Sequence, residues 1–230
     1  MESKKYETIG MVVAMDKEIK PFFSKFGENV IEKTVGGYTV FECLIKNKKV
    51  YLIKSGIGEI YAAAATEILI SVFNCDIILN FGVCGSLTDN ISVCETVIVN
   101  GVVHYDFDLS DIDDVKVGQY PGREVVLKPS EELINLALDI NKNVKTAICA
   151  SADKFVAKKE IKEKLTRDFN ADVCDMECAG VLLTSLNSKV PTLIIKAVSD
   201  GNGGAEEFNR RVYEASKVYL DTINAILERI

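Results

Sequence analysis

The sequence predicts an α/β protein in which helices cover a mixed central sheet. Short apolar runs that are typical of buried strands alternate with longer segments of helical period, and this alternation favours a mostly parallel sheet. A stretch with hairpin character near the N-terminus adds antiparallel strands. With 230 residues, of which 48% are hydrophobic and 27% charged, we expect one domain spanning residues 1–230.

The expected elements follow in chain order. Strands are predicted at Thr8–Ala14, Val50–Ile53, Asp76–Phe81, Thr96–Val103, Thr146–Ala150 and Thr192–Val198. Helices are predicted at Glu59–Phe73, Ser130–Leu138, Lys158–Phe169, Glu177–Leu186 and Ala205–Ile230. Residues 33–54 alternate with turn residues, which predicts an antiparallel hairpin attached to the main sheet. The acidic and aromatic segment His104–Val117 has no clear period, so we expect a functional or interface loop there.

Charge and apolar patterning exclude several classes of function. A net charge of −7 and a pI near 5.0 disfavour binding of nucleic acid and favour a small-molecule ligand. The N-terminus lacks the apolar core of a signal peptide, and no apolar run is long enough to span a bilayer. We therefore expect a cytoplasmic protein that does not bind membranes.

Cofactor signals are weak. The seven cysteines mostly lie within apolar segments and are expected to be reduced and buried. Cys174 and Cys178 have the spacing of a metal pair, but His104 is the only histidine, so no metal site is expected. The glycine clusters match neither a dinucleotide-binding nor a Walker motif, so no nucleotide cofactor is expected either.

Polar residues follow the predicted strands at several points. The buried run that begins at Thr192 ends at Ser199 and Asp200, where a carboxylate can reach a ligand outside the carboxyl end of the sheet. The alternative is that Asp200 caps a helix or starts a turn with Gly201. Similar junctions occur at residues 14–19, 54–58, 80–86, 151–156 and 175–177. Together they predict one pocket rim.

Three acids, Glu18, Glu177 and Asp200, reach these junctions from separate parts of the chain. Cleavage of a glycosidic bond needs one acid to protonate the leaving group and one carboxylate to activate water. A ribosyl substrate adds a carboxylate that accepts hydrogen bonds from its hydroxyls. Each acid alone is more often a solvated first-turn residue, so the functional interpretation depends on their convergence.

Four segments resemble the nucleoside phosphorylase and nucleosidase superfamily, and most closely its bacterial 5′-methylthioadenosine/S-adenosylhomocysteine nucleosidases. They are Lys54-Ser-Gly-Ile-Gly58, Ser151-Ala-Asp-Lys-Phe155, Asp175-Met-Glu-Cys-Ala-Gly180 and Ala197-Val-Ser-Asp200. The resemblance covers essentially the whole chain and implies a three-layer α/β/α sandwich around a mixed central sheet. It implies hydrolysis of adenosine-type thionucleosides, without a metal or other cofactor.

The resemblance also implies roles for individual residues. Asp200 would protonate adenine N7 with support from Ser199, and Glu18 would activate the attacking water. The remaining contacts would come from Glu177 on the ribose hydroxyls, Met176 against the sugar, Phe155 stacked on adenine, the Val156 backbone at the purine edge and Ile57 beside the 5′ substituent. Family members are homodimers, and the loop matching His104–Pro121, with Leu109 as one contributor, would close the partner's pocket.

The sequence departs from this family at Val83, where close relatives carry a serine near the water. Phosphorylases of the superfamily bind phosphate with an arginine and a serine in this loop, but the chain has Asn80 and Val83. An anion is better bound by an arginine fork and hydroxyls, so hydrolysis is favoured. A phosphate-dependent purine nucleoside phosphorylase remains the alternative, because Lys54, Lys196 or Arg210 offers a cation.

Three further questions stay open at the level of sequence. The base and 5′ substituent are undetermined among methylthioadenosine, S-adenosylhomocysteine, deoxyadenosine and futalosine-like nucleosides. A nucleoside sensor without turnover is a third class, since fold does not fix function. His104 is either a catalytic base or a structural residue, and the structural role is the more common one.

Overall fold

A central mixed sheet organises the computed structural model, which describes residues 6–27 and 29–230. Its nine strands, counted over that part of the chain, lie in the order β2-β3-β4-β1-β5-β8-β7-β6-β9. They are β1 Thr8–Val13, β2 Ile31–Val35, β3 Tyr38–Ile45, β4 Lys48–Lys54, β5 Ile77–Ser86, β6 Thr96–His104, β7 Lys145–Ser151, β8 Val173–Asp175 and β9 Thr192–Asp200. β5 also pairs with β9, so five strands close into a ring.

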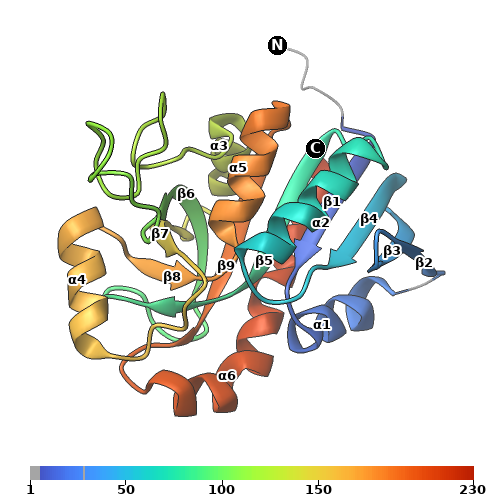
Figure 1. Ribbon diagram of the computed structural model, residues 1–230. Helices are drawn as coiled ribbons and strands as arrows, with labels where there is room; N and C mark the ends of the chain where they lie inside the picture. Colours follow the sequence, from blue (N-terminus) through green and yellow to red (C-terminus); the bar gives the residue numbers. More distant parts are fainter. Residues whose placement is uncertain (1–5, 28) are drawn as a thin grey trace.

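Helices cover both faces of this sheet. They are α1 Asp16–Phe26, α2 Glu59–Ser71, α3 Glu131–Ile140, α4 Lys159–Phe169, α5 Cys178–Ser188, α6 Gly204–Val218 and α7 Leu220–Arg229. Phe22 of α1, Val212 of α6 and Ile223 of α7 share one apolar core, whereas Leu69 of α2 and Val181 of α5 belong to another. Figure 1 shows α2 in front of the sheet and places α6 beside α1. The predicted α/β fold with a mixed central sheet is confirmed.

The antiparallel part of the sheet is larger than predicted. β2, β3 and β4 form a three-stranded meander, and β4 then pairs in parallel with β1. The antiparallel hairpin predicted for residues 33–54 is therefore confirmed, and the observed meander has three strands. Its first strand, β2, begins two residues earlier, at Ile31, and its side chains are almost all exposed.

Other differences from the sequence prediction concern β5, the last helix and α1, besides the short strand β8, which was not predicted. β5 runs past Phe81 to Ser86 with every residue buried, so the glycines of this segment lie within a strand. The predicted helix Ala205–Ile230 is divided at Tyr219, whose ring is fully buried against Phe81. The third element is α1, which had not been predicted. It buries Ile19 and Phe22, although Pro21 lies between them.

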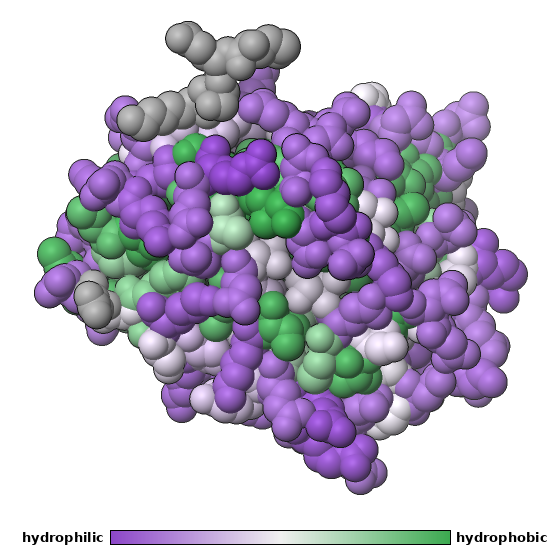
Figure 2. Space-filling model, turned by 180° about the vertical axis from the view of Figure 1, so that it is seen from behind, coloured by the Kyte–Doolittle hydropathy of each residue, from purple (hydrophilic) through white to green (hydrophobic). Residues whose placement is uncertain are grey.

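The face of the molecule opposite to the view of Figure 1 has few large apolar areas. Figure 2 shows a mostly hydrophilic face on that side, with apolar residues in several smaller areas. Across the described residues, no helix combines the length and the apolar character needed to cross a membrane. All seven cysteines are free thiols, and all but Cys94 are buried.

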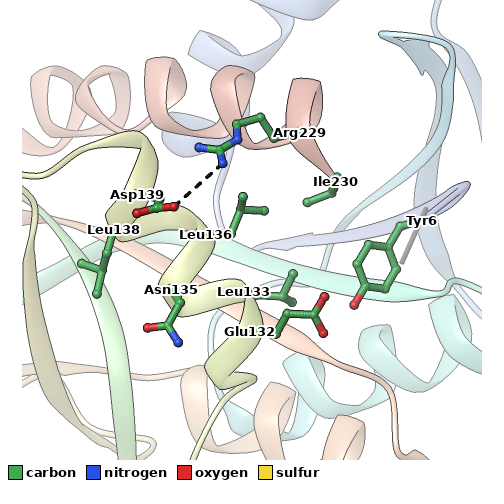
Figure 3. Close-up of a pocket in the computed structure, with 9 residues that line it drawn as sticks. All are labelled: Tyr6, Glu132, Leu133, Asn135, Leu136, Leu138, Asp139, Arg229 and Ile230. Atoms are coloured by element: carbon green, nitrogen blue, oxygen red, sulfur yellow. Dashed lines mark ion pairs between the residues drawn. The ribbon is translucent and has the colours of Figure 1, made fainter. Parts of the chain in front are cut away.

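A cavity of about 440 Å³ lies between Tyr6, α3 and the C-terminal end of α7. Figure 3 shows Asp139 and Arg229 facing each other across its upper edge, where they form an ion pair of 4.0 Å. Leu133, Leu136 and other apolar side chains supply most of its wall. None of the acids at the strand ends lines this cavity, so it is separate from the site described next.

Candidate active site

A second cavity, of about 340 Å³, lies at the carboxyl ends of β5, β8 and β9. It collects every predicted site residue except Val156: Glu18, Ile57, Val83, Phe155, Met176, Glu177, Ser199 and Asp200. Val156 lines a small adjoining cavity of about 30 Å³, which shares Phe155, Met176 and Asp200 with the larger one. The structure therefore brings the predicted site residues together, as ligand sites in open α/β sheets require.

Asp200 is the last residue of β9 and is almost fully buried. Its Oδ1 accepts a hydrogen bond of 2.9 Å from Ser199 Oγ, and Lys162 Nζ lies 3.8 Å from its Oδ2. Burial raises the pKa of Asp200 above its ordinary value, although Ser199 and Lys162 oppose the shift.

Asp200 does not cap the helix that follows. α6 begins at Gly204 without a side-chain cap, and the carboxylate of Glu207 accepts the N–H groups of Gly201 and Gly203 at 2.8 and 3.2 Å. The capping interpretation of Asp200 is therefore wrong. The strand instead presents this carboxyl to the cavity.

Glu18 lies in the first turn of α1 and is held by two backbone amides. Met15 N–H donates to its Oε2 and Val83 N–H to its Oε1, both at 2.8 Å. A Cβ atom at Gly82 would lie 2.5 Å from Oε1, so this close approach requires glycine. Burial raises the pKa of Glu18, and Lys196 and the two amides oppose that effect. Each carboxylate oxygen keeps a second lone pair for a ligand or water.

Glu177 occupies the position before α5 and accepts the Gly58 N–H at 3.1 Å. Burial, followed by the neighbouring charge of Asp175, raises its pKa to about 8, with Glu18 adding to the shift. Gly58 has φ +112, and a Cβ there would lie 2.7 Å from Asp153 Oδ1. Glycine is needed at this position for the loop before α2 to reach Glu177.

A buried ion pair lies close to Glu18 and Glu177. Lys196 Nζ of β9 lies 2.9 Å from Asp175 Oδ2, and both side chains are almost fully buried. Burial alone would lower the pKa of Lys196, but the charges of Asp175, Glu177 and Glu18 raise it well above its ordinary value. Burial would likewise raise the pKa of Asp175, yet Lys196 and hydrogen bonds from Cys178 and Ser151 bring it below its ordinary value.

Sequence reasoning treated Lys196 only as a possible anion ligand and did not foresee this pair. A lysine inside the apolar run Thr192–Val198 was the available signal, because such a side chain needs a partner when it is buried. Lys54, the second candidate cation, pairs with Asp16 at 2.8 Å on the surface. Neither lysine lines the cavity.

The aromatic wall also contains a residue that sequence reasoning missed. Phe208 of α6 lies edge to face with Phe155, with ring centroids 5.7 Å apart, and both rings line the cavity. Phe155 remains 43% exposed, so one of its faces is available to a planar ligand. Met15 completes the apolar side of the cavity.

His104 lies outside the cavity. Its Nδ1 is 2.7 Å from Tyr120 Oη and its Nε2 is 3.0 Å from Asp106. Phe107 stacks on Tyr120 with ring centroids 3.8 Å apart. These contacts support the structural role of the histidine, because they order the acidic loop that follows β6.

One potential metal-ligand group lies behind the site in the described chain. Cys149, Asp175 and Cys178 place one ligand atom each within 4.8 Å of the others. Asp175 already pairs with Lys196, so a cation here would meet an ammonium group. Cys174 is not a member of this group, although the sequence had suggested it as the partner of Cys178.

The site can therefore hold a flat aromatic group together with a group that carries hydroxyls. An aromatic ring and a buried acid with a raised pKa line the same cavity as three further carboxyls, those of Glu18, Asp175 and Glu177. A raised pKa increases the fraction of an acid that carries a proton it can donate. Carboxylates accept hydrogen bonds from hydroxyl groups.

Comparisons with known proteins identify similar chains. Residues 8–230 match the family model described as the Phosphorylase superfamily. The chain is 28% identical over 228 residues to an aminodeoxyfutalosine nucleosidase from Campylobacter jejuni, covering 96% of this chain and 99% of the relative. It is 31% identical over 197 residues to a 5′-methylthioadenosine/S-adenosylhomocysteine nucleosidase from Haemophilus ducreyi, covering 84% of each.

Solved structures give the same result. A futalosine hydrolase of Helicobacter pylori superimposes with a TM-score of 0.93 at 26% identity, over 97% of this chain and 98% of that one. A mutant nucleosidase from the same organism, with 5′-methylthioadenosine in its active site, also gives 0.93 at 26% identity, over 97% and 99% of the two chains.

Replacement of Lys196 tests whether its ammonium group stabilises the buried charge of Asp175. We expect Lys196→Met to lower the free energy of unfolding by about 3–5 kcal/mol, because it leaves Asp175 charged and unpaired. The control is Lys54→Met, which breaks an exposed pair and should cost less than about 1 kcal/mol. Urea unfolding of both variants at pH 7 measures the difference, and equal losses would contradict the assignment.

Proposed function

The chain belongs to the phosphorylase superfamily and is a purine nucleosidase within it, and we propose that it hydrolyses adenine thionucleosides such as 5′-methylthioadenosine and S-adenosylhomocysteine. One observation carries the proposal: Asp200, Glu18 and Glu177 converge on a single cavity that Phe155 also lines. The proposal treats residues 1–230 as one nucleosidase domain.

In this proposal, Asp200 is the general acid. Its raised pKa increases the fraction of Asp200 that carries a proton, and this proton would pass to N7 of adenine as the bond between N9 and C1′ breaks. Ser199 would orient the Asp200 carboxyl through its hydrogen bond. The purine then leaves as a neutral base, and positive charge develops on the ribose.

Glu18 is proposed to take a proton from the water that forms the new bond to C1′. Its two backbone hydrogen bonds fix the carboxylate while leaving lone pairs free. Val83 cannot supply a side-chain hydroxyl, but its N–H supports Glu18 directly. Glu177 would accept hydrogen bonds from the ribose hydroxyls, with Met176 against the sugar and Val156 at the purine edge.

The cavity favours hydrolysis over phosphorolysis. It is lined by acids and by apolar side chains, and neither lysine nor arginine of the described chain lines it. A phosphate ion would therefore meet carboxylates without a guanidinium or ammonium partner.

Two classes of 5′ substituent compete. Ile57, Met15 and Phe208 give the cavity an apolar side that suits an alkylthio group. An aminodeoxyfutalosine nucleosidase matches the chain over almost its whole length, so this nucleoside is the second candidate substrate.

Adenine release decides between these possibilities. We expect the protein to release adenine from 5′-methylthioadenosine in phosphate-free buffer, because the site supplies both an acid and a base. Chromatography of the products with and without phosphate, and with aminodeoxyfutalosine as the second substrate, measures this. Release only with phosphate would indicate a phosphorylase, whereas tight binding without release would indicate a sensor.

Asp200→Asn tests the acid. We expect kcat to fall by at least about a hundredfold, because the amide cannot supply the proton. Circular dichroism should show a folded protein, since the amide still accepts the hydrogen bond from Ser199. Turnover within a few-fold of the parent protein would refute the role assigned to Asp200.

We also propose a homodimer whose interface includes the start of α2. Ile60 and Tyr61 are 78% and 57% exposed beside Ile57, which lines the cavity. We expect Ile60→Asp to shift the protein from dimer to monomer in sedimentation velocity and to raise KM, because a charge would be buried in the interface. The control Leu44→Asp alters a residue that is 67% exposed on β3 and should leave the oligomeric state unchanged. A monomeric parent protein would contradict the proposal.

A further inference from the structure

A chain of four buried polar groups extends inward from the wall of the cavity, which Asp175 lines. Glu59 Oε1 lies 2.5 Å from Ser151 Oγ, which lies 2.6 Å from Asp175 Oδ1. Lys196 Nζ closes the chain at 2.9 Å from Asp175 Oδ2. All four residues are buried, and they come from α2, β7, β8 and β9.

The hydrogens in this chain can be counted. The Ser151 hydroxyl has one hydrogen and accepts the Ala179 N–H at 3.2 Å. It can therefore donate to only one of the two carboxyl oxygens that lie within 2.6 Å of it. If both carboxyls were ionised, the other contact would join two acceptors without a hydrogen, so one carboxyl carries a proton.

The surroundings decide which carboxyl carries it. Asp175 faces the Lys196 ammonium and accepts the Cys178 N–H, which stabilise its charge. Glu59 accepts one further N–H, from Gly180, and it faces the negative charges of Asp175 and Asp153. Within residues 6–27 and 29–230 no cation is paired with Glu59, so the proton lies there.

Two ionisable tyrosines also lie near Glu59. Tyr105 and Tyr120 lie close enough for the Glu59 charge to raise the pKa of each, although burial is the larger cause. Neither supplies a positive charge. Burial and then Asp175 raise the pKa of Glu59 to about 7.

Glu59 also connects the segments that hold the proposed ribose ligand. Its Oε2 accepts the Gly180 N–H in the first turn of α5, and its own N–H donates to Asp153 at 2.7 Å. The preceding residue, Gly58, donates its N–H to Glu177. A Cβ at Gly180 would lie 2.3 Å from the Glu59 carbonyl oxygen, so the starts of α2 and α5 are in direct contact.

We propose that Glu59 is a positioning residue that acts in its protonated form: the neutral carboxyl donates to Ser151, fixes the start of α2 against α5, and so holds Gly58 on Glu177. The part of this inference that concerns substrate rests on the proposed function. Ionisation of Glu59 would place two carboxylates on one hydroxyl and push the start of α2 away from β8. Glu177 would then lose its hydrogen bond from Gly58, and substrate affinity would fall without a direct effect on bond cleavage.

Glu59→Gln imitates the protonated state permanently. Its amide oxygen can accept the Gly180 N–H while its NH₂ donates to Ser151. The matched control is Glu67→Gln, the same change at an exposed position of the same helix.

The first measurement is thermal melting of the parent protein and both variants between pH 5 and 8.5. A folded-state pKa of about 7, raised from 4.5, gives the parent a contribution that is lost as pH rises from 5 to about 7 and is then absent, whereas glutamine does not titrate. The melting temperature of Glu59→Gln should therefore rise relative to the parent by several degrees between pH 5 and about 7 and stay level above that. Glu67→Gln should show no such trend.

The second measurement is KM for the nucleoside over the same pH range. The ratio of parent KM to Glu59→Gln KM should increase by at least about threefold between pH 6 and 8.5, with little change in the ratio of kcat values. Titration of Glu177 affects both proteins and cancels in this ratio. Ser151→Ala, which removes the shared hydroxyl, should raise KM already at pH 6.

Each failure has its own signature. Parallel melting profiles of the parent and Glu59→Gln would overturn the protonation, and a KM ratio independent of pH would overturn the positioning role. An unfolded Glu59→Gln would also overturn the inference, because glutamine reproduces the hydrogen bonds of the neutral acid. Failure of the proposed function would instead appear as no turnover in any of these proteins, with the melting difference intact.

Discussion

The buried ammonium group of Lys196 stabilises several acids in the interior of this protein. Lys196 pairs with Asp175, and its charge also acts on Glu18 and Glu177. Several carboxyls around one cavity would repel one another strongly without a cation, since interior charges are poorly screened. The pair therefore lets the fold gather these acids around the cavity.

The arrangement of the strands brings these acids to one end of the sheet. β5 and β9 are long, fully buried and parallel, so both carry polar residues to the same end of the sheet. β8 adds Asp175 between β5 and β7, while α1 places Glu18 beside Gly82. The acids reach the cavity from separate elements, and each is fixed by hydrogen bonds from backbone or side chain.

Backbone amides donate hydrogen bonds to two of the carboxylates in the cavity. Val83 has no hydroxyl, yet its N–H donates directly to Glu18. Gly58 does the same for Glu177 from a conformation with positive φ. A substitution that removes a polar side chain can thus leave the support of a carboxylate intact, provided that the main chain keeps its position.

The sequence by itself determined the α/β class, the mixed sheet and the placement of Glu18, Glu177 and Asp200 near strand ends, because apolar period and strand-end polarity are local properties. It missed β8, which has only three residues, and the division of the last helix at Tyr219, which follows from packing against Phe81. Only the tertiary structure paired Lys196 with Asp175, placed Phe208 beside Phe155 and put Glu59 and Asp175 on one hydroxyl. These contacts join residues far apart in the chain, and their energies depend on burial and distance, which no local pattern encodes.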